Sequence, residues 1–146
     1  TLIDADTCEP HEVGKVPNAD MLGYLTHLPT ATDLVAIEMI ASYGMPVGRE
    51  VFETCVWIGR YIQCLTAASV AIVRIPRQPV KVHHCHSARA TDATIRQALV
   101  DRFAPGQPNH GKGTKGSPGF FHEFRADIWQ AMALAVYTAD KLNITT

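Results

Sequence analysis

The chain has 146 residues, 47% of them apolar and 18% charged, with 13 basic and 14 acidic side chains and a net charge of −1. The length suits a single domain and the composition suits a globular protein, which argues against a largely disordered chain. The charge balance predicts no overall basic surface, so any surface that binds nucleic acid must be local.

Nothing in the sequence predicts membrane insertion or export. No apolar run reaches the ~20 residues of a membrane-spanning helix, and the opening residues, TLIDAD, lack the basic flank and apolar centre of a signal peptide. The four cysteines show no CxxC spacing, which favours reduced, mostly buried thiols. We therefore expect a cytoplasmic protein.

The first forty residues predict a hairpin, a helix and a strand. Residues 2–3 and 11–16 read as two short strands around a turn-rich link. Residues 18–28 carry apolar side chains at helical spacing after a plausible N-cap at Asn18, and Pro29 stops this helix. The apolar run 34–40, LVAIEMI, is the clearest candidate for a central strand that is covered on both faces.

The middle of the chain alternates helix and strand. Residues 49–65 are apolar nearly all round, which predicts a buried helix. Residues 70–75 predict another strand, and 80–82 a short one. Thr91 is an expected N-cap for a helix that runs to Phe103.

The last part of the chain combines a loop with a helix. Residues 104–119, APGQPNHGKGTKGSPG, are rich in Gly and Pro and predict a flexible loop. A closing helix is expected from about residue 122 to 142. The order of elements predicts an α/β fold with a mixed sheet.

Glu38 stands out because it lies inside the apolar run LVAIEMI. Burying a carboxylate is costly unless a cation, hydrogen bonds or a metal compensates its charge. Two interpretations are open: a strand-end acid that faces solvent or pairs with an arginine, and a metal ligand.

Asp127 favours the metal ligand, since it interrupts the apolar stretch ADIWQAMAL of the last helix. A carboxylate on a central strand and another near the start of a packing helix supply the oxygen ligands that Mg²⁺ requires. Glu123 lies one helical turn earlier and either faces the same way as a third ligand or is a first-turn acid favoured by the helix dipole.

Three segments of the chain resemble the RuvC-type crossover-junction endonucleases, particularly the RuvC-like proteins of phages and prophages. These are residues 34–63 (LVAIEMIASYGMPVGREVFETCVWIGRYIQ), residues 81–102 (KVHHCHSARATDATIRQALVDR) and the final helix with its Asp127-x-x-x-Ala131-x-Ala133-x-Ala135 pattern. Together they cover most of the chain in the family's order.

The resemblance implies an RNase H-like fold, in which helices cover both faces of a five-stranded mixed sheet. It also implies hydrolysis of phosphodiester bonds in branched DNA such as Holliday junctions, by a homodimer that uses Mg²⁺, or Mn²⁺ as a substitute, in a bacterial or phage-infected cell. Carried over by position, Glu38 is the catalytic, metal-binding acid of the central strand and Asp127 that of the last helix.

The sequence departs from this family at its start. The family's first catalytic Asp follows the pattern Ile-Asp-x-Gly, whereas Ile3-Asp4-Ala5-Asp6 lacks the glycine and lies too close to Glu38. We interpret residues 1–5 as the second strand, with the first strand missing from this chain, and keep Asp4 as a tentative catalytic substitute. A further family acid is replaced by Phe124, so Glu123 is an approximate stand-in.

Contacts to DNA phosphates require Lys and Arg at the surface. Basic residues cluster in the second family-like segment and in the Gly-rich loop, and five are predicted DNA contacts: Lys81, Arg89, Arg96, Lys112 and Lys115. The alternative for the loop is a solvated linker. Tyr43 is expected either to stack on a base or to pack on its own loop.

The sequence His83-His84-Cys85-His86 invites a zinc interpretation. Four adjacent ligands on a strand would point alternately to opposite faces, and no second cluster supplies the missing ligands. Two functions therefore lead: a metal-dependent, structure-selective DNA endonuclease, and a junction-binding protein of the same fold that has lost catalysis. A first acid in the site is what distinguishes them.

Overall fold

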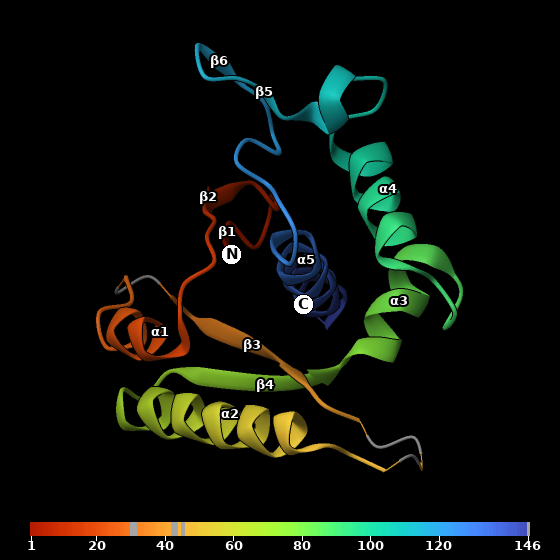
Figure 1. Cartoon of the computed structure of the whole chain (residues 1–146). Helices are drawn as coiled ribbons and strands as arrows, with labels where there is room; N and C mark the ends of the chain where they lie inside the picture. Colours follow the sequence, from red (N-terminus) through yellow and green to blue (C-terminus); the bar gives the residue numbers. More distant parts are fainter. Residues whose placement is uncertain (30–31, 42–43, 45, 146) are drawn as a thin grey trace. The chain divides into compact units, whose positions relative to one another are not determined.

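The structure is a computed structural model that describes residues 1–29, 32–41, 44 and 46–145, so Tyr43 lies outside the described residues. The chain falls into two compact units, Thr1–Lys15 with Gln78–Thr146 (unit 1) and Val16–Arg77 (unit 2), and each is described here by itself (Figure 1). Helices and strands occur in both, which confirms the predicted mixed α/β class. None of the described helices is long and apolar enough to cross a membrane.

Unit 2 is built around two parallel strands, β3 (Leu34–Met39) and β4 (Ala71–Pro76). They pair in register from Leu34 opposite Ala71 to Met39 opposite Pro76, and helix α2 (Arg49–Ala67) connects them. Helix α1 (Asn18–Leu25) packs on α2 (Figure 1). The predicted strands at 34–40 and 70–75 are thus confirmed, and the long crossover helix is what parallel pairing requires.

Two expectations for unit 2 do not hold. Among the described residues β3 pairs with β4 alone and is mostly half-buried, so it is not a central strand covered on both faces. Helix α2 is not buried all round either, because Phe52 is 61% and Val56 59% exposed. Its buried positions are Ile58 and Leu65.

Unit 1 contains the predicted N-terminal hairpin and three helices. Strand β1 (Leu2–Ile3) pairs antiparallel with β2 (Pro10–Glu12), which is shorter than the predicted segment 11–16. Helix α3 (Arg77–Cys85) replaces the strand predicted at 80–82, which was wrong: the β-propensity of the two valines is overridden by the surrounding helix.

The core of unit 1 lies between helices α4 (Asp92–Phe103) and α5 (Ile128–Thr145). Five of their side chains are fully buried: Ile95, Leu99, Met132, Ala133 and Val136. Thr91 caps α4 as predicted, since its hydroxyl accepts from the Thr94 backbone and the Thr94 hydroxyl accepts from the Thr91 backbone.

An aromatic cluster precedes α5, where the sequence predicted the first turn of that helix. Phe121 and Phe124 are almost completely buried and pack edge-on or tilted against Trp129. The backbone from Phe121 to Ile128 has positive φ angles at Glu123 and Ala126, which a right-handed helix excludes. The prediction that the helix begins at residue 122 was therefore wrong.

The Gly-rich segment 104–119 contains a 3₁₀ turn (Pro108–Gly111) and a small hairpin of β5 (Gly113–Thr114) and β6 (Ser117–Pro118). Gly113 has a φ of 66°, and a Cβ there would lie 2.3 Å from the Ser117 carbonyl oxygen. Only glycine allows this close approach. Flexibility of the segment stays a prediction.

Candidate functional site

Glu38 is the fifth of the six residues of β3 and lies near the carboxyl end of that strand. Its side chain is 42% exposed, and its Oε1 accepts from Nη1 of Arg77 at 3.3 Å. Of the two interpretations offered by the sequence, the solvent-facing acid paired with an arginine describes the structure. The same exposure leaves the carboxylate accessible to a cation.

Asp127 directly precedes α5, and its backbone carbonyl accepts from the amides of Gln130 and Ala131. Its side chain is 73% exposed and forms an ion pair with Lys15, which lies in the same unit. An exposed ion pair of this kind contributes little to stability and exchanges readily. Asp127 therefore resembles Glu38, since each is an accessible carboxylate that forms an ion pair with a basic side chain.

Glu123 does not share a helical face with Asp127, because both residues precede α5. It is exposed and has a φ of 64° within the turn that follows Phe121. The i, i+4 argument for a third ligand was therefore wrong, although a role for the residue as a metal ligand stays a prediction.

Asp4 organises the turn of the N-terminal hairpin. Its Oδ1 accepts from the Thr7 amide at 2.8 Å, the Asp6 amide at 2.9 Å and the Thr7 hydroxyl at 3.0 Å. The hydrogen bond from the Thr7 backbone, supported by the others, lowers the pKa of Asp4 below its usual value. These contacts give Asp4 a structural role in the turn.

Glu38 belongs to unit 2 and Asp127 to unit 1, so their sharing of one site stays a prediction. Within the described residues no group of three or more His, Cys, Asp or Glu side chains is arranged to hold a metal ion. Each carboxylate is nevertheless the hard oxygen donor that Mg²⁺ prefers, and each is open to solvent.

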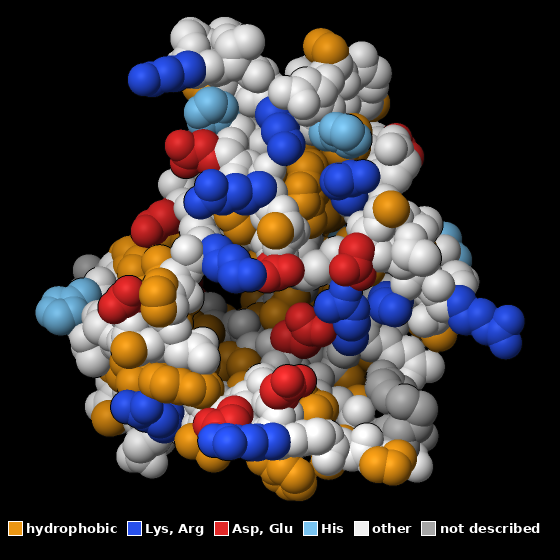
Figure 2. Space-filling model, viewed as in Figure 1, with side chains coloured by type: hydrophobic (Ala, Val, Ile, Leu, Met, Phe, Trp, Pro, Cys, Tyr) orange, Lys and Arg blue, Asp and Glu red, His pale blue; other side chains and the backbone are white. Residues whose placement is uncertain are grey.

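The five predicted DNA contacts all lie in unit 1. Arg89, between α3 and α4, and Lys115, in the turn between β5 and β6, are exposed, whereas Lys81, Arg96 and Lys112 are half-buried. Figure 2 shows basic and acidic side chains intermixed over the face in view. Binding of DNA at these residues stays a prediction.

The histidine cluster forms a network that the sequence did not predict. His83 and His84 lie in α3, and each contacts α5: His83 Nε2 lies 2.6 Å from Asp140 Oδ2, and His84 Nε2 donates to the Ala133 carbonyl at 2.8 Å. Burial lowers the pKa of His84, which favours its neutral form. The two histidines therefore have separate partners, and because they lie in a helix, the argument from alternating strand side chains against a shared zinc ion does not apply to them.

Asp140 is the centre of this network. Its two oxygens accept from both terminal nitrogens of Arg102 at 2.7 and 2.8 Å, and these hydrogen bonds lower the pKa of Asp140 to about 2. Because Asp140 is ionised at neutral pH, the proton in its contact with His83 lies on the histidine Nε2. An acid within a predicted apolar helix is the sequence signal that could have identified Asp140, as it did Asp127.

All four cysteines are free, but they are less buried than expected. Cys8 is buried and Cys55 is exposed on α2, while Cys64 and Cys85 are half-buried.

Comparison of the chain with protein-family models, curated proteins and solved structures gives no match.

Proposed function

We propose that the chain is a metal-dependent endonuclease that hydrolyses phosphodiester bonds in branched DNA, in the cytoplasm of a bacterial or phage-infected cell. The observation that carries the proposal is the position of Glu38, an accessible carboxylate near the carboxyl end of a parallel strand. In α/β sheets ligands bind at this end of the strands. The proposed fold is RNase H-like, and it is supported by the parallel pair β3–β4 with its connecting helix α2; the antiparallel pair β1–β2 forms a separate two-stranded sheet.

Glu38 and Asp127 are the proposed ligands of Mg²⁺. Both carboxylates are exposed, and the ion pair that each forms with a basic side chain is of the weak surface kind that a divalent ion can displace. When bound, Mg²⁺ supplies activation of the attacking water and stabilisation of the leaving 3′ oxygen. The chain's own contribution is to hold the two carboxylates, while Arg89 and Lys115 offer exposed charge to the DNA phosphates.

The proposed homodimer is supported by the exposed face of α2. Phe52 and Val56 lie one turn apart on this face, and Gly59 has open space around its Cα. In an antiparallel pair of α2 helices each Phe52 would cover Gly59 of the other copy, which gives the self-complementary contact that a two-fold interface needs.

A second candidate function is junction binding without catalysis. The hydrogen bonds that hold Asp4 in its turn favour it, because they engage the acid proposed as a substitute for the family's first one. With Asp4 engaged in its turn, Glu38 and Asp127 are the two carboxylates left to bind the metal, which is fewer than a phosphoryl-transfer site usually has.

Cleavage of a labelled four-way junction with Mg²⁺ and with Mn²⁺ tests the first candidate, and a gel shift with the same junction reports binding. We expect Glu38→Gln and Asp127→Asn each to abolish cleavage and leave binding intact. Glu50→Gln and Asp6→Asn, which remove exposed carboxylates from the same two units, serve as matched controls and should cleave normally.

Binding by the unmodified chain without cleavage would favour the second candidate. If the chain neither binds nor cleaves the junction, both candidates are wrong.

A further inference from the structure

The outer face of helix α2 in unit 2 carries the two most exposed large apolar side chains of the described residues. Phe52 is 61% and Val56 59% exposed, and they lie one helical turn apart. Over α2, hydrophobic side chains reach the surface between basic and acidic ones (Figure 2). Adjacent exposed apolar side chains of this kind favour an interaction surface.

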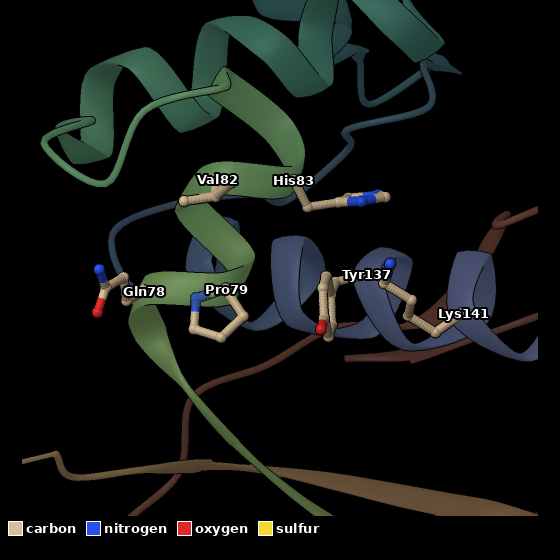
Figure 3. Close-up of a pocket in the computed structure, with 6 residues that line it drawn as sticks. All are labelled: Gln78, Pro79, Val82, His83, Tyr137 and Lys141. Carbon is tan, nitrogen blue, oxygen red and sulfur yellow. The ribbon is translucent and has the colours of Figure 1, made fainter.

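The shallow pocket between α3 and α5 of unit 1 differs in this respect (Figure 3). Its ring and cationic side chains contact one another within the unit. The His83 ring packs edge-on against Tyr137 with centroids 5.3 Å apart, and the Lys141 ammonium lies 5.7 Å from the Tyr137 ring centroid. Contacts between α3 and α5 therefore account for these residues, whereas no such contacts cover Phe52 and Val56 among the described residues.

Four residues of the outer face of α2 form two lines along the helix. Phe52 and Gly59 are seven residues apart, and so are Glu53 and Arg60. Seven residues make almost two full turns of an α-helix, so the members of each pair lie one above the other. By the same spacing Val56 lies between the two lines, near the middle of each.

The first line is complementary to itself in size. Phe52 projects an exposed ring at one end, and at the other end a Cβ on Gly59 would meet no atom within 4 Å. In an antiparallel pair of α2 helices, each Phe52 ring faces the open space at Gly59 of the other copy. A parallel pair would instead place the two phenylalanines side by side and leave the two glycines facing each other.

The second line is complementary to itself in charge. Glu53 is exposed, and its ion pair with Arg49, at 3.6 Å, is a weak surface pair that exchanges readily. Arg60 is exposed and stacks on Trp57 at 4.2 Å, with no ion pair to a carboxylate among the described residues. The antiparallel arrangement that joins Phe52 to Gly59 also brings Glu53 of each copy beside Arg60 of the other.

We propose that α2 pairs antiparallel with α2 of a second copy of this chain about Val56, and that Glu53 and Arg60 form ion pairs between the copies. A two-fold axis near Val56 produces the size contact and the charge contact twice each, as an isologous interface requires. This inference rests on the homodimer of the proposed function and deepens it by assigning the register and the charge pairs. It does not depend on nuclease activity.

Sedimentation equilibrium of the full chain, without DNA or metal, tests the pairing. We expect a monomer–dimer equilibrium with a dissociation constant on the order of 10–100 μM, because one helix face per copy gives an interface at the small end of the specific range. The variants are Val56→Arg, Glu53→Lys, Arg60→Glu and the double variant with both reversals. Glu50→Lys, which reverses an exposed acid of α2 outside the two lines, is the matched control, and circular dichroism checks that each variant folds.

We expect Val56→Arg to abolish the dimer, because it places two like charges at the two-fold axis. Glu53→Lys and Arg60→Glu should each weaken pairing about tenfold, since each reversal turns two attractive contacts into repulsive ones. The double variant restores opposite charges at both contacts and should return to within about threefold of the unmodified chain, as should Glu50→Lys.

A double variant as weak as the two single reversals would overturn the antiparallel register while leaving the homodimer in place. A dimer that Val56→Arg leaves intact would overturn α2 as the interface. A chain that stays monomeric up to about 1 mM would overturn both this inference and the homodimer, whereas the cleavage assay alone decides the nuclease proposal.

Discussion

Asp127 and Asp140 interrupt the same apolar stretch of sequence, yet their surroundings in the structure differ. Asp127 is 73% exposed beside one lysine, whereas Asp140 is 19% exposed and bonded to both Arg102 and His83. A partly buried charge needs this compensation, and an exposed one does not. Sequence periodicity predicted a site at Asp127 and none at Asp140, because the partners that distinguish the two acids lie far away along the chain.

The Asp140 network makes unit 1 sensitive to acid. A carboxylate whose pKa falls from 3.8 to about 2 on folding stabilises the folded state fully above about pH 4, and this contribution is lost as the pH falls toward 2. We expect Asp140→Asn to lower the free energy of unfolding by roughly 2 kcal/mol at neutral pH and to remove this part of the pH dependence.

Urea unfolding at a series of pH values, followed by Trp129 fluorescence in a Trp57→Phe background, measures the effect. Asp101→Asn, at an exposed position of the same unit, is the control. Parallel pH profiles for Asp140→Asn and the unmodified chain would show that the network does not stabilise the fold.

Lys15 competes with a metal for Asp127 if the proposed site is correct. Lys15→Gln should therefore tighten Mn²⁺ binding several-fold while changing stability by less than about 0.5 kcal/mol, because the pair is exposed. Calorimetric titration with Mn²⁺ measures the affinity, and Lys115→Gln controls for the loss of one positive charge. Unchanged or weaker Mn²⁺ binding by Lys15→Gln would count against Asp127 as a ligand.

At the scale of elements, the sequence correctly predicted the helices and strands that residues close together in the chain determine. The strands at Leu34–Met39 and Ala71–Pro76 and the capped helix Asp92–Phe103 follow from apolar runs and cap residues. Two predictions were wrong where contacts with distant parts of the chain determine the structure. Helix α3 includes the Val-Lys-Val run that was predicted as a strand, and the aromatic cluster at Phe121 and Phe124 occupies the predicted first turn of α5, which begins at Ile128 instead.

The capping box of α4 provides a test at this scale. Thr91→Ala removes the acceptor of the Thr94 amide, and we expect a loss of about 1 kcal/mol in the free energy of unfolding. Thr91→Ser keeps the hydroxyl and should lose only a few tenths. The Trp129 reporter in urea measures both, and equal stabilities for the two variants would show that the cap contributes nothing.

At the scale of the whole molecule, the structure contains two compact units, and the single RNase H-like domain that the sequence predicts stays a prediction. Hydrophobic periodicity and cap residues predict the local secondary structure of a segment, so they do not specify how elements far apart in the chain pack together. Of the candidate site, the sequence predicts that Glu38 and Asp127 share one metal ion; both carboxylates are exposed, and their sharing of one site stays a prediction.

A shared core is testable because each unit contains one tryptophan, Trp57 in unit 2 and Trp129 in unit 1. Met132→Ala creates a cavity at a fully buried position of unit 1 and should cost ~2–5 kcal/mol. If the units form one domain, as proposed, the urea transitions of both tryptophans shift together in single-Trp backgrounds. A shift confined to Trp129 would show two independently folding units.

The central proposal is that Glu38 and Asp127 bind one metal site together. A double-mutant cycle of Mn²⁺ affinity, measured by electron paramagnetic resonance, tests this most directly with the unmodified chain, Glu38→Gln, Asp127→Asn and the double variant. We predict that each single substitution weakens Mn²⁺ binding by about tenfold or more and that the second adds little, because one ligand alone binds poorly. Affinities that change independently, or that do not change at all, would contradict a shared site.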